Sequence, residues 1–240
     1  DDDQKIQLPT IHQAVSFLLE HQPAHVRLLI TSRTEPPLAL PRLRARGHLL
    51  EVGIDALRFS LAEADAFLSQ VMGLTLSPPE VAALHARTEG WVTGLQLAAL
   101  ALQAPAAQST ARSAARFIAD FSGKDRYVGE YLLDEVFQKQ SEKIQTFLRQ
   151  TSILGRLSGP LCDHLTGQSD GHETLAKLDR TNLFIIPLDN EGRWYRYHPL
   201  FADFLKARLQ LTDPDLEPLL HCRAAEWYVD QGLPDQAIGH

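Results

Sequence analysis

The hydrophobic pattern of the chain changes near residue 58, from mixed helix and strand to helix alone. Residues 11–21 carry apolar side chains at helical spacing, and Pro23 ends this pattern. Residues 26–33 are rich in apolar residues (Val26 and 28–30), which is typical of a strand buried on both faces of a parallel sheet. Residues 49–53 predict a second strand. The first 58 residues therefore predict a small α/β part at the start of a mainly helical chain.

A series of helices is predicted after this α/β part. Ser60 and Glu63 have the spacing of a capping box, in which each side chain bonds the backbone N–H of the other residue. Ser77 and Glu80 repeat this spacing, and Pro78 suits the first helical turn. Further helices are predicted at 92–103, 114–121, 125–138 and 142–154, and a loose segment rich in Ala, Pro, Gln and Ser at 104–113.

Residues 183–205 predict a β-hairpin followed at once by a helix. The runs LFIIPL and WYRYH are rich in strand-forming residues, and the turn cluster between them contains Gly192. Pro199 suits the first turn of the following helix, whose apolar residues share one face. With the helices upstream, including a candidate recognition helix at 172–182, this order predicts a winged helix over residues 123–212.

The last part of the chain, residues 213–240, predicts a pair of helices separated by Gly232. Their small and aromatic residues have a spacing like that of the first half of a tetratricopeptide-like repeat. One repeat cannot bury its own apolar face, so further repeats are expected in a longer protein. We expect this pair to expose an apolar face that includes Leu220, Ala224 and Trp227.

Charge and composition narrow the range of functions. The net charge is −7, and the recognition helix carries balanced charges, so direct DNA contact by this chain is not expected. No apolar run approaches 18 residues, so no membrane span is expected. The two cysteines, Cys162 and Cys222, lack metal-binding spacing and are interpreted as reduced thiols of a cytoplasmic protein. The histidines are scattered without ligand spacing, so no metal is expected.

Several motifs together carry a family resemblance over nearly all 240 residues. In chain order they are TSR, L-x-E-x-G, EGWVTGLQLAAL, YLLDEVF, FLRQTSIL, LDRTNLF and GRWYRYHPLFADFLKARL. Each motif is weak by itself, but their order and spacing are specific. The chain resembles the central part of the large ATP-binding LuxR-type transcriptional regulators, a maltose-regulator-like group of STAND NTPases.

The resemblance implies a domain order and a mechanism. Residues 1–58 would be the C-terminal part of a P-loop NTPase core, 59–122 a helical lid, 123–212 the winged helix, and 213–240 the start of a TPR-like sensor superhelix. The family's helix-turn-helix DNA-binding domain would lie elsewhere in the longer protein. ATP or ADP with Mg²⁺ would switch that protein between a closed state and an open oligomer that activates transcription.

The resemblance also assigns roles near the start of the chain. Asp1 and Asp2 match the acidic pair that ends a Walker B strand and acts on Mg²⁺ and water, although a frayed acidic terminus is the alternative. Arg33 ends a predicted buried strand and resembles the sensor arginine that contacts a γ-phosphate. A surface arginine at the start of a loop is the alternative for Arg33.

Two further sites follow from the resemblance. Gly90 and Val92 match a lid motif whose third residue packs on adenine, although the family often has proline at the position of Val92. A helix junction with Trp91 in the core is the alternative. His198 matches the winged-helix histidine that approaches the β-phosphate of ADP in the closed state. A structural histidine bonded to a nearby carbonyl is the alternative for His198.

The resulting hypothesis is a regulatory segment that couples nucleotide state to the sensor superhelix and to a distant DNA-binding domain. The chain contains no G-x-x-x-x-G-K-[ST] sequence, so by itself it is not expected to bind ATP tightly or to act as an ATPase. The longer protein would be a slow STAND-type ATPase. The alternative hypothesis is a protein-interaction scaffold of helical repeats with a winged helix and no nucleotide role.

Overall fold

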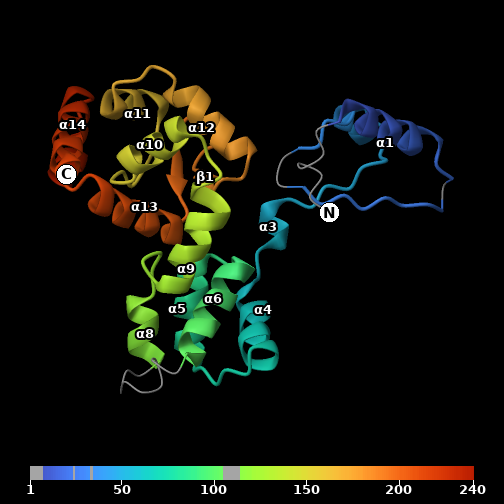
Figure 1. Ribbon diagram of the computed structural model, residues 1–240, viewed down its shortest axis with the longest axis horizontal. Coiled ribbons are helices and arrows are strands. Elements are labelled where there is room, and N and C mark those ends of the chain that lie inside the picture. The colour runs from blue at the N-terminus through green and yellow to red at the C-terminus, as the bar shows by residue number, and fades with distance from the viewer. Residues whose placement is uncertain (1–7, 24, 33–34, 105–113) are drawn as a thin grey trace.

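The computed structural model describes residues 8–23, 25–32, 35–104 and 114–240. Figure 1 shows an N-terminal stretch that lies to one side, a lower bundle that contains α4 to α8, and an upper lobe that contains α10 to α14. One continuous apolar core extends through the bundle and the lobe, from Ala64 to Tyr228. Within the described residues, no helix is both long enough and apolar enough to cross a membrane.

The described part of the N-terminal stretch contains helices, and it forms neither of the predicted strands. Its helices are α1 (Pro9–His21), α2 (Leu40–Ala45) and α3 (Ile54–Leu57), so the helix predicted over 11–21 is confirmed. The strands predicted at 26–33 and 49–53 are wrong as far as these residues are described, because the only sheet in the described part is two-stranded and lies in the lobe. Leu29 and Leu50 are each 88% exposed. An apolar run favours burial, but by itself it does not specify the neighbouring strand that a sheet requires.

The helical bundle has the predicted caps. The Ser60 backbone N–H donates to Glu63 Oε2 at 2.8 Å, and the Glu63 backbone N–H donates to Ser60 Oγ at 3.3 Å. Ser77 and Glu80 form the second capping box. The bundle consists of α4 (Leu61–Ala66), which continues as the π-helical segment η2 (Phe67–Val71), and of α5 (Pro78–Thr88), α6 (Val92–Gln103) and α8 (Ala114–Asp120). Most of the loose segment predicted at 104–113 lies outside the described residues.

The upper lobe is a winged helix, as predicted. Its helices are α9 (Arg126–Tyr131), which continues as the π-helical segment η3 (Leu132–Phe137), and α10 (Glu142–Thr151), α11 (Gly159–Thr166), α12 (Gly171–Arg180) and α13 (Pro199–Thr212). The strands β1 (Ile185–Pro187) and β2 (Tyr195–Tyr197) pair antiparallel, with Ile185 opposite Tyr197 and Pro187 opposite Tyr195. The helix α11 was not predicted separately from the sequence. The fold is therefore mainly helical with a small two-stranded sheet.

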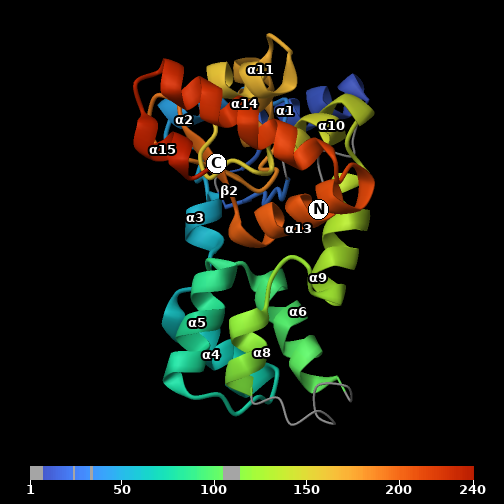
Figure 2. The same ribbon diagram turned by 90° about the vertical axis from the view of Figure 1, so that its left-hand side faces the viewer.

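The two views agree that α13 lies between the bundle and the rest of the lobe (Figures 1 and 2). It contacts α5 of the bundle, and α10 and α14 of the lobe. Phe201 and Leu205 of α13 are fully buried. The helix α13 therefore belongs to the packing of both the bundle and the lobe.

The C-terminal pair consists of α14 (Leu216–Asp230) and α15 (Pro234–Ile238). Leu220 and Ala224 are 0% exposed, because α14 packs on α11. The Arg223 guanidinium also donates to the Leu165 carbonyl at the end of α11, at 2.9 Å. The expectation that Leu220 and Ala224 form an exposed apolar face is therefore wrong. The sequence showed an apolar stripe, but its partner is the winged helix and not a further repeat.

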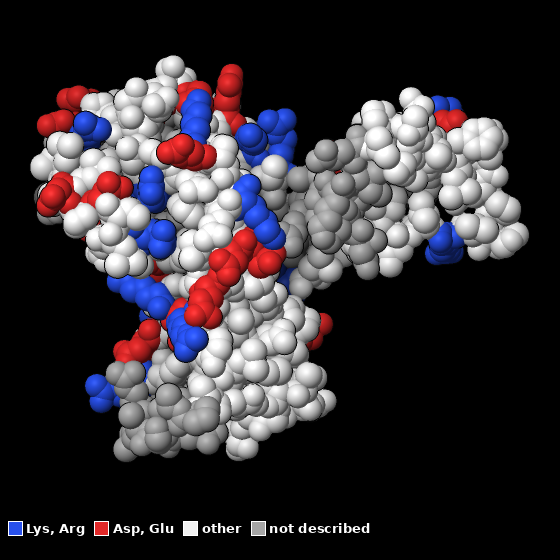
Figure 3. Space-filling view, viewed as in Figure 1, with Lys and Arg blue, Asp and Glu red and all other residues white. Residues whose placement is uncertain are grey.

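Charged side chains of both signs are interspersed over the face in Figure 3. The exposed positions of the candidate recognition helix α12 include Glu173, Lys177 and Arg180, as the sequence analysis expected. Such a mixed surface is unlike the basic stripe of most DNA-reading helices.

Candidate functional site

His198 is buried where the winged helix meets the helical bundle. It follows β2 directly and is the N-cap of α13, where its Nδ1 accepts the Leu200 N–H at 3.3 Å. Its Nε2 lies 2.9 Å from the carbonyl oxygen of Thr88, the last residue of α5. Because a carbonyl oxygen only accepts, Nε2 carries the proton and Nδ1 is free to accept. His198 is therefore bonded through both nitrogens as a neutral imidazole.

The environment of His198 favours this neutral form. Burial lowers the pKa of His198, because an imidazolium loses its hydration in the interior. The hydrogen bond to Thr88 and the charge of Glu89 act in the opposite direction, whereas Arg58 and Arg196 lower the pKa further. Of the two roles considered for His198, the bond to a carbonyl is present in this structure. Its contact with a phosphate stays a prediction.

The turn between α5 and α6 is the part of the bundle that lies beside His198. Two successive residues of this turn, Glu89 at φ 49° and Gly90 at φ 73°, have left-handed backbone conformations. The Phe59 N–H donates to the Gly90 carbonyl at 2.9 Å. A Cβ on Gly90 would lie 2.4 Å from the Phe59 carbonyl oxygen, so only glycine fits here. This packing gives Gly90 a structural role beside the nucleotide contact that the resemblance implies.

A cluster of three charged side chains lies at this contact between the α5–α6 turn of the bundle and the start of α13, which we call the seam. Arg196 Nη1 contacts Glu89 Oε1 at 2.8 Å, and Arg58 Nη1 lies 3.6 Å from Glu89 Oε2. The side chains of Arg196, Arg58 and Glu89 are 32%, 27% and 18% exposed, so the cluster is partly shielded from water. It ties three segments together, because Arg58 precedes the bundle, Glu89 lies in its α5–α6 turn and Arg196 lies in β2.

Aromatic rings, among them Trp91 and Phe184, pack around His198 in the seam. The Trp91 ring centroid lies 4.9 Å from that of Phe184 and 5.9 Å from that of His198, both at edge-on angles. Trp91 therefore packs at the helix junction, as the alternative for this motif expected. Val92 begins α6 directly after Trp91 and is half-buried. The fold thus brings the segment that contains Gly90 and Val92 to His198.

The structure places only some of the predicted site residues. Asp1, Asp2 and Arg33 lie outside the described residues, so their roles stay predictions. No sequence motif marked Arg58, Glu89 or Arg196 as site residues. Alternate residues of a strand face opposite sides, and Tyr195 and Tyr197 are both buried on one side. The alternation therefore indicated that Arg196 faces away from the core of the winged helix. Local pattern gave no comparable signal for Arg58.

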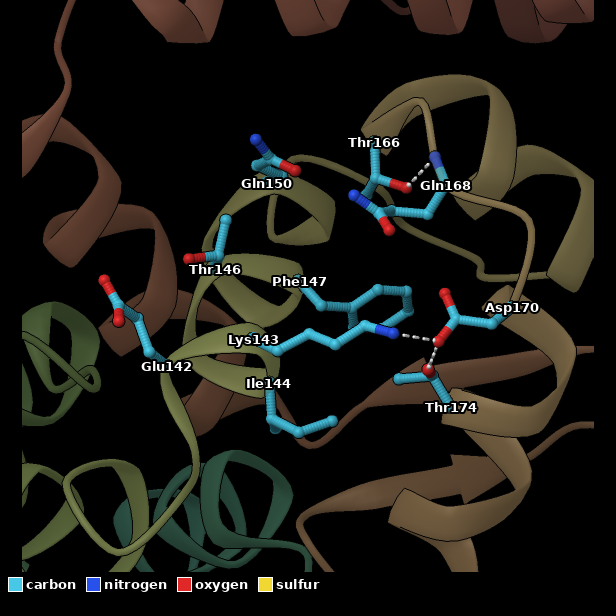
Figure 4. Close-up of a pocket in the computed structure, with 10 residues that line it drawn as sticks. All are labelled: Glu142, Lys143, Ile144, Thr146, Phe147, Gln150, Thr166, Gln168, Asp170 and Thr174. Atoms are coloured by element: carbon cyan, nitrogen blue, oxygen red, sulfur yellow. Dashed lines mark hydrogen bonds and ion pairs between the residues drawn. The ribbon is translucent and has the colours of Figure 1, made fainter.

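A separate cavity of about 320 Å³ lies on the winged helix between α10 and the α11–α12 turn (Figure 4). Phe147 extends into it, and the Lys143–Asp170 ion pair of 2.6 Å spans it. The Lys143 ammonium lowers the pKa of Asp170 chiefly through this hydrogen bond. The lining residues belong to the winged helix, so the cavity does not belong to the seam around His198.

The described residues also bear on metal and thiol chemistry. They contain no group of three or more His, Cys, Asp or Glu side chains arranged to hold a metal ion. Cys162 and Cys222 are free thiols, the first buried and the second exposed. Burial raises the pKa of Cys162, so this thiol stays protonated at neutral pH.

Comparison with known proteins gives the family. The MalT winged helix domain matches residues 133–217. Over all 240 residues, the chain is 37% identical to the HTH-type transcriptional regulator MalT of Yersinia enterocolitica and 38% identical to those of Yersinia pestis and Yersinia pseudotuberculosis. The chain spans 26% of the length of these relatives. The family resemblance is thereby confirmed: over its whole length the chain is similar to a segment of MalT regulators, and residues 133–217 match the MalT winged helix domain.

Proposed function

We propose that this chain is the coupling segment of a nucleotide-dependent transcriptional activator of the LuxR type. The similarity to relatives named HTH-type transcriptional regulators supports a role in transcription. Residues 1–58 would complete an NTPase core that binds ATP or ADP with Mg²⁺, and residues 59–122 would act as its lid. The winged helix at 123–212 would pass the nucleotide state to a sensor superhelix beginning at 213–240, and from there to a helix-turn-helix domain. Activation would involve self-assembly of the longer protein.

The observation that carries this proposal is the hydrogen bond between His198 and Thr88. It joins the proposed lid to the winged helix through the same Nε2–H that a phosphate oxygen would accept. A phosphate contact by Nε2 therefore competes with the contact to Thr88. This competition couples the nucleotide to the arrangement of the two parts, since a ligand shifts an equilibrium only by binding its two states differently.

The test uses the longer protein that contains this segment. A phosphate contact made only in the closed state stabilises that state, so His198→Ala is expected to weaken ADP binding by about 10- to 150-fold, the value of a charge-assisted hydrogen bond. The same substitution is expected to raise transcription in the absence of inducer. His198→Asn separates the phosphate contact from folding, because asparagine is a good N-cap for α13.

The control is His164→Ala, which removes an exposed histidine of α11. It is expected to leave ADP affinity and basal transcription at the wild-type level. If both His198 variants fold and also leave these two quantities unchanged, His198 does not read the nucleotide. The protein-interaction scaffold without a nucleotide role would then be the better account of the segment.

A further inference from the structure

The cluster of Arg58, Glu89 and Arg196 has more hydrogen-bond donors than acceptors. Each guanidinium carries five N–H donors, and Glu89 offers one carboxylate oxygen to each. Oε1 has a close contact with Arg196 at 2.8 Å. Oε2 is buried 3.6 Å from Arg58 and accepts no hydrogen bond within the described part of the chain. One carboxylate therefore leaves donors of both arginines unused.

The charge of the cluster is also unbalanced. Two guanidinium charges face one carboxylate, and His198 is neutral. The remaining acid near Arg58 is Asp55, whose carboxylate is 95% exposed and lies 4.0 Å away, so it neutralises little. Arg196 has one further contact, to the Tyr197 carbonyl at 3.5 Å. A net positive charge thus stays in a partly shielded part of the seam.

The position of Glu89 adds a third observation. Its backbone is left-handed, with φ 49° and ψ 37°, a conformation that a glutamate adopts at an energetic cost. The turn therefore holds this side chain between the arginines in spite of local strain. A tetrahedral oxyanion has more acceptor oxygens than a carboxylate, so it can accept hydrogen bonds from two guanidinium groups at once.

We propose that Arg58 and Arg196 form a binding site for a tetrahedral oxyanion of the phosphate type, and that Glu89 is its built-in competitor. When the oxyanion binds, it replaces Glu89 between the guanidinium groups. The turn that carries Glu89 then loses its ion pair with β2, which weakens the seam beside the His198–Thr88 bond. This inference goes beyond the nucleotide role proposed above, because it concerns a site formed by this chain alone.

The test is calorimetric titration of the 240-residue chain with inorganic phosphate, and separately with pyrophosphate, at constant ionic strength. Glu89→Gln removes the competing charge and keeps the size of the side chain. It is expected to bind both anions at least about tenfold more tightly than the wild type, the effect of one charge-assisted contact. Adding Arg196→Gln to Glu89→Gln is expected to reduce binding to the background of non-specific anion association.

Matched controls come from the exposed Glu191–Arg193 ion pair in the same wing. Glu191→Gln and Arg193→Gln make the same changes of charge, and neither is expected to alter anion affinity. The proposal is overturned if Glu89→Gln binds no more tightly than the wild type, or if Arg193→Gln weakens binding as much as Arg196→Gln does. Glu89→Gly provides a second test, because glycine fits the left-handed backbone and also removes the carboxylate.

A parallel titration with ADP distinguishes the source of the oxyanion. If ADP binds Glu89→Gln no more tightly than pyrophosphate, the site takes a free oxyanion. If ADP binds at least about tenfold more tightly and needs Arg196, the site takes the phosphate tail of a nucleotide, with about 1.4 kcal/mol from the rest of that ligand. Both outcomes support an oxyanion site at these arginines, and absence of binding by all three ligands to Glu89→Gln and Glu89→Gly overturns it.

Discussion

His198 donates its Nε2–H to the carbonyl oxygen of Thr88 at 2.9 Å, across 110 residues of sequence. The donor belongs to the N-cap of α13, and the acceptor belongs to the C-terminal end of α5. Carbonyl groups in the last turn of a helix lack intrahelical partners, and a donor there is favourable. The Thr88 carbonyl also accepts the Trp91 N–H at 2.9 Å, so the side chain that begins α13 supplies a second donor to a carbonyl at the end of α5.

We predict that His198→Ala lowers the free energy of unfolding of this chain by about 2–3 kcal/mol, from the loss of the N-cap and of a buried hydrogen bond. His198→Asn is expected to lose less, about 1 kcal/mol, because its side chain still caps α13. Urea denaturation measures both values. His164→Ala, at an exposed position, is the control and is expected to change the free energy by under about 0.5 kcal/mol. Equal losses of stability in the two His198 variants would contradict the prediction that capping of α13 contributes part of the loss in His198→Ala.

The pH dependence of stability provides a second prediction. Burial lowers the pKa of His198 in the folded state, so the unfolded state binds more protons once the pH falls below about 6.5, the ordinary histidine pKa. The contribution of His198 is therefore complete above that pH and declines as the pH falls toward the lowered folded pKa.

The measurement is urea denaturation from pH 7.5 to 5, in the wild type and in His198→Asn. The stability difference between the two proteins is expected to shrink as the pH falls. Taking this difference separates His198 from other groups that titrate there, such as His240, whose pKa burial also lowers. A difference that stays constant over this range would contradict the lowered pKa.

The sequence predicted the local elements of the winged helix well. Pro199 and the apolar face after it correspond to α13, and the alternation around Arg196 corresponds to β2. These features depend on neighbours within one helix or hairpin, so periodicity and turn residues contain the needed information. The capping boxes at Ser60 and Ser77 were predictable for the same reason, because each involves residues only three apart.

The pairing of distant segments was not predictable in this way. Arg58, Glu89 and Arg196 come from three segments, and no local period relates them. The apolar face of α14 was recognised, but its partner α11 was not, because a hydrophobic stripe does not identify what covers it. The run around Leu29 failed for a related reason, since an apolar run specifies neither its hydrogen-bonding partner nor its burial.

Gly123 provides a prediction about how the segment between α8 and α9 packs against α13. A Cβ at this position would lie 1.8 Å from the Leu200 carbonyl oxygen and 2.7 Å from the Phe204 backbone nitrogen, both in α13. Backbone atoms within a helix cannot move aside cheaply, so Gly123→Ala is expected to lower the free energy of unfolding by about 2–4 kcal/mol. Gly155→Ala is the matched control, because a Cβ there meets nothing within 4 Å. Similar melting curves for the two variants would contradict this close contact.

The absence of a phosphate-binding loop from the sequence provides a prediction for nucleotides. The 240 residues contain no G-x-x-x-x-G-K-[ST], whose backbone N–H groups and lysine hold phosphates tightly. ATP and ADP are therefore expected to bind the wild-type chain with dissociation constants weaker than about 10 µM, or about −7 kcal/mol. Calorimetry in the presence of Mg²⁺ measures this directly. Tighter binding would mean that this segment alone holds the main nucleotide contacts.

The contact between α14 and the winged helix provides the last prediction. Leu220 is 0% exposed, whereas the adjacent Leu219 is 47% exposed. If α11 covers the inner face of α14, Leu220→Ala leaves a cavity and lowers the free energy of unfolding by about 2–5 kcal/mol. Leu219→Ala is expected to cost under about 1 kcal/mol, because its side chain already contacts water. Chemical denaturation followed by circular dichroism compares the two. Equal small losses would mean that α14 is not held by the winged helix in solution, and the original expectation of an open repeat face would be restored.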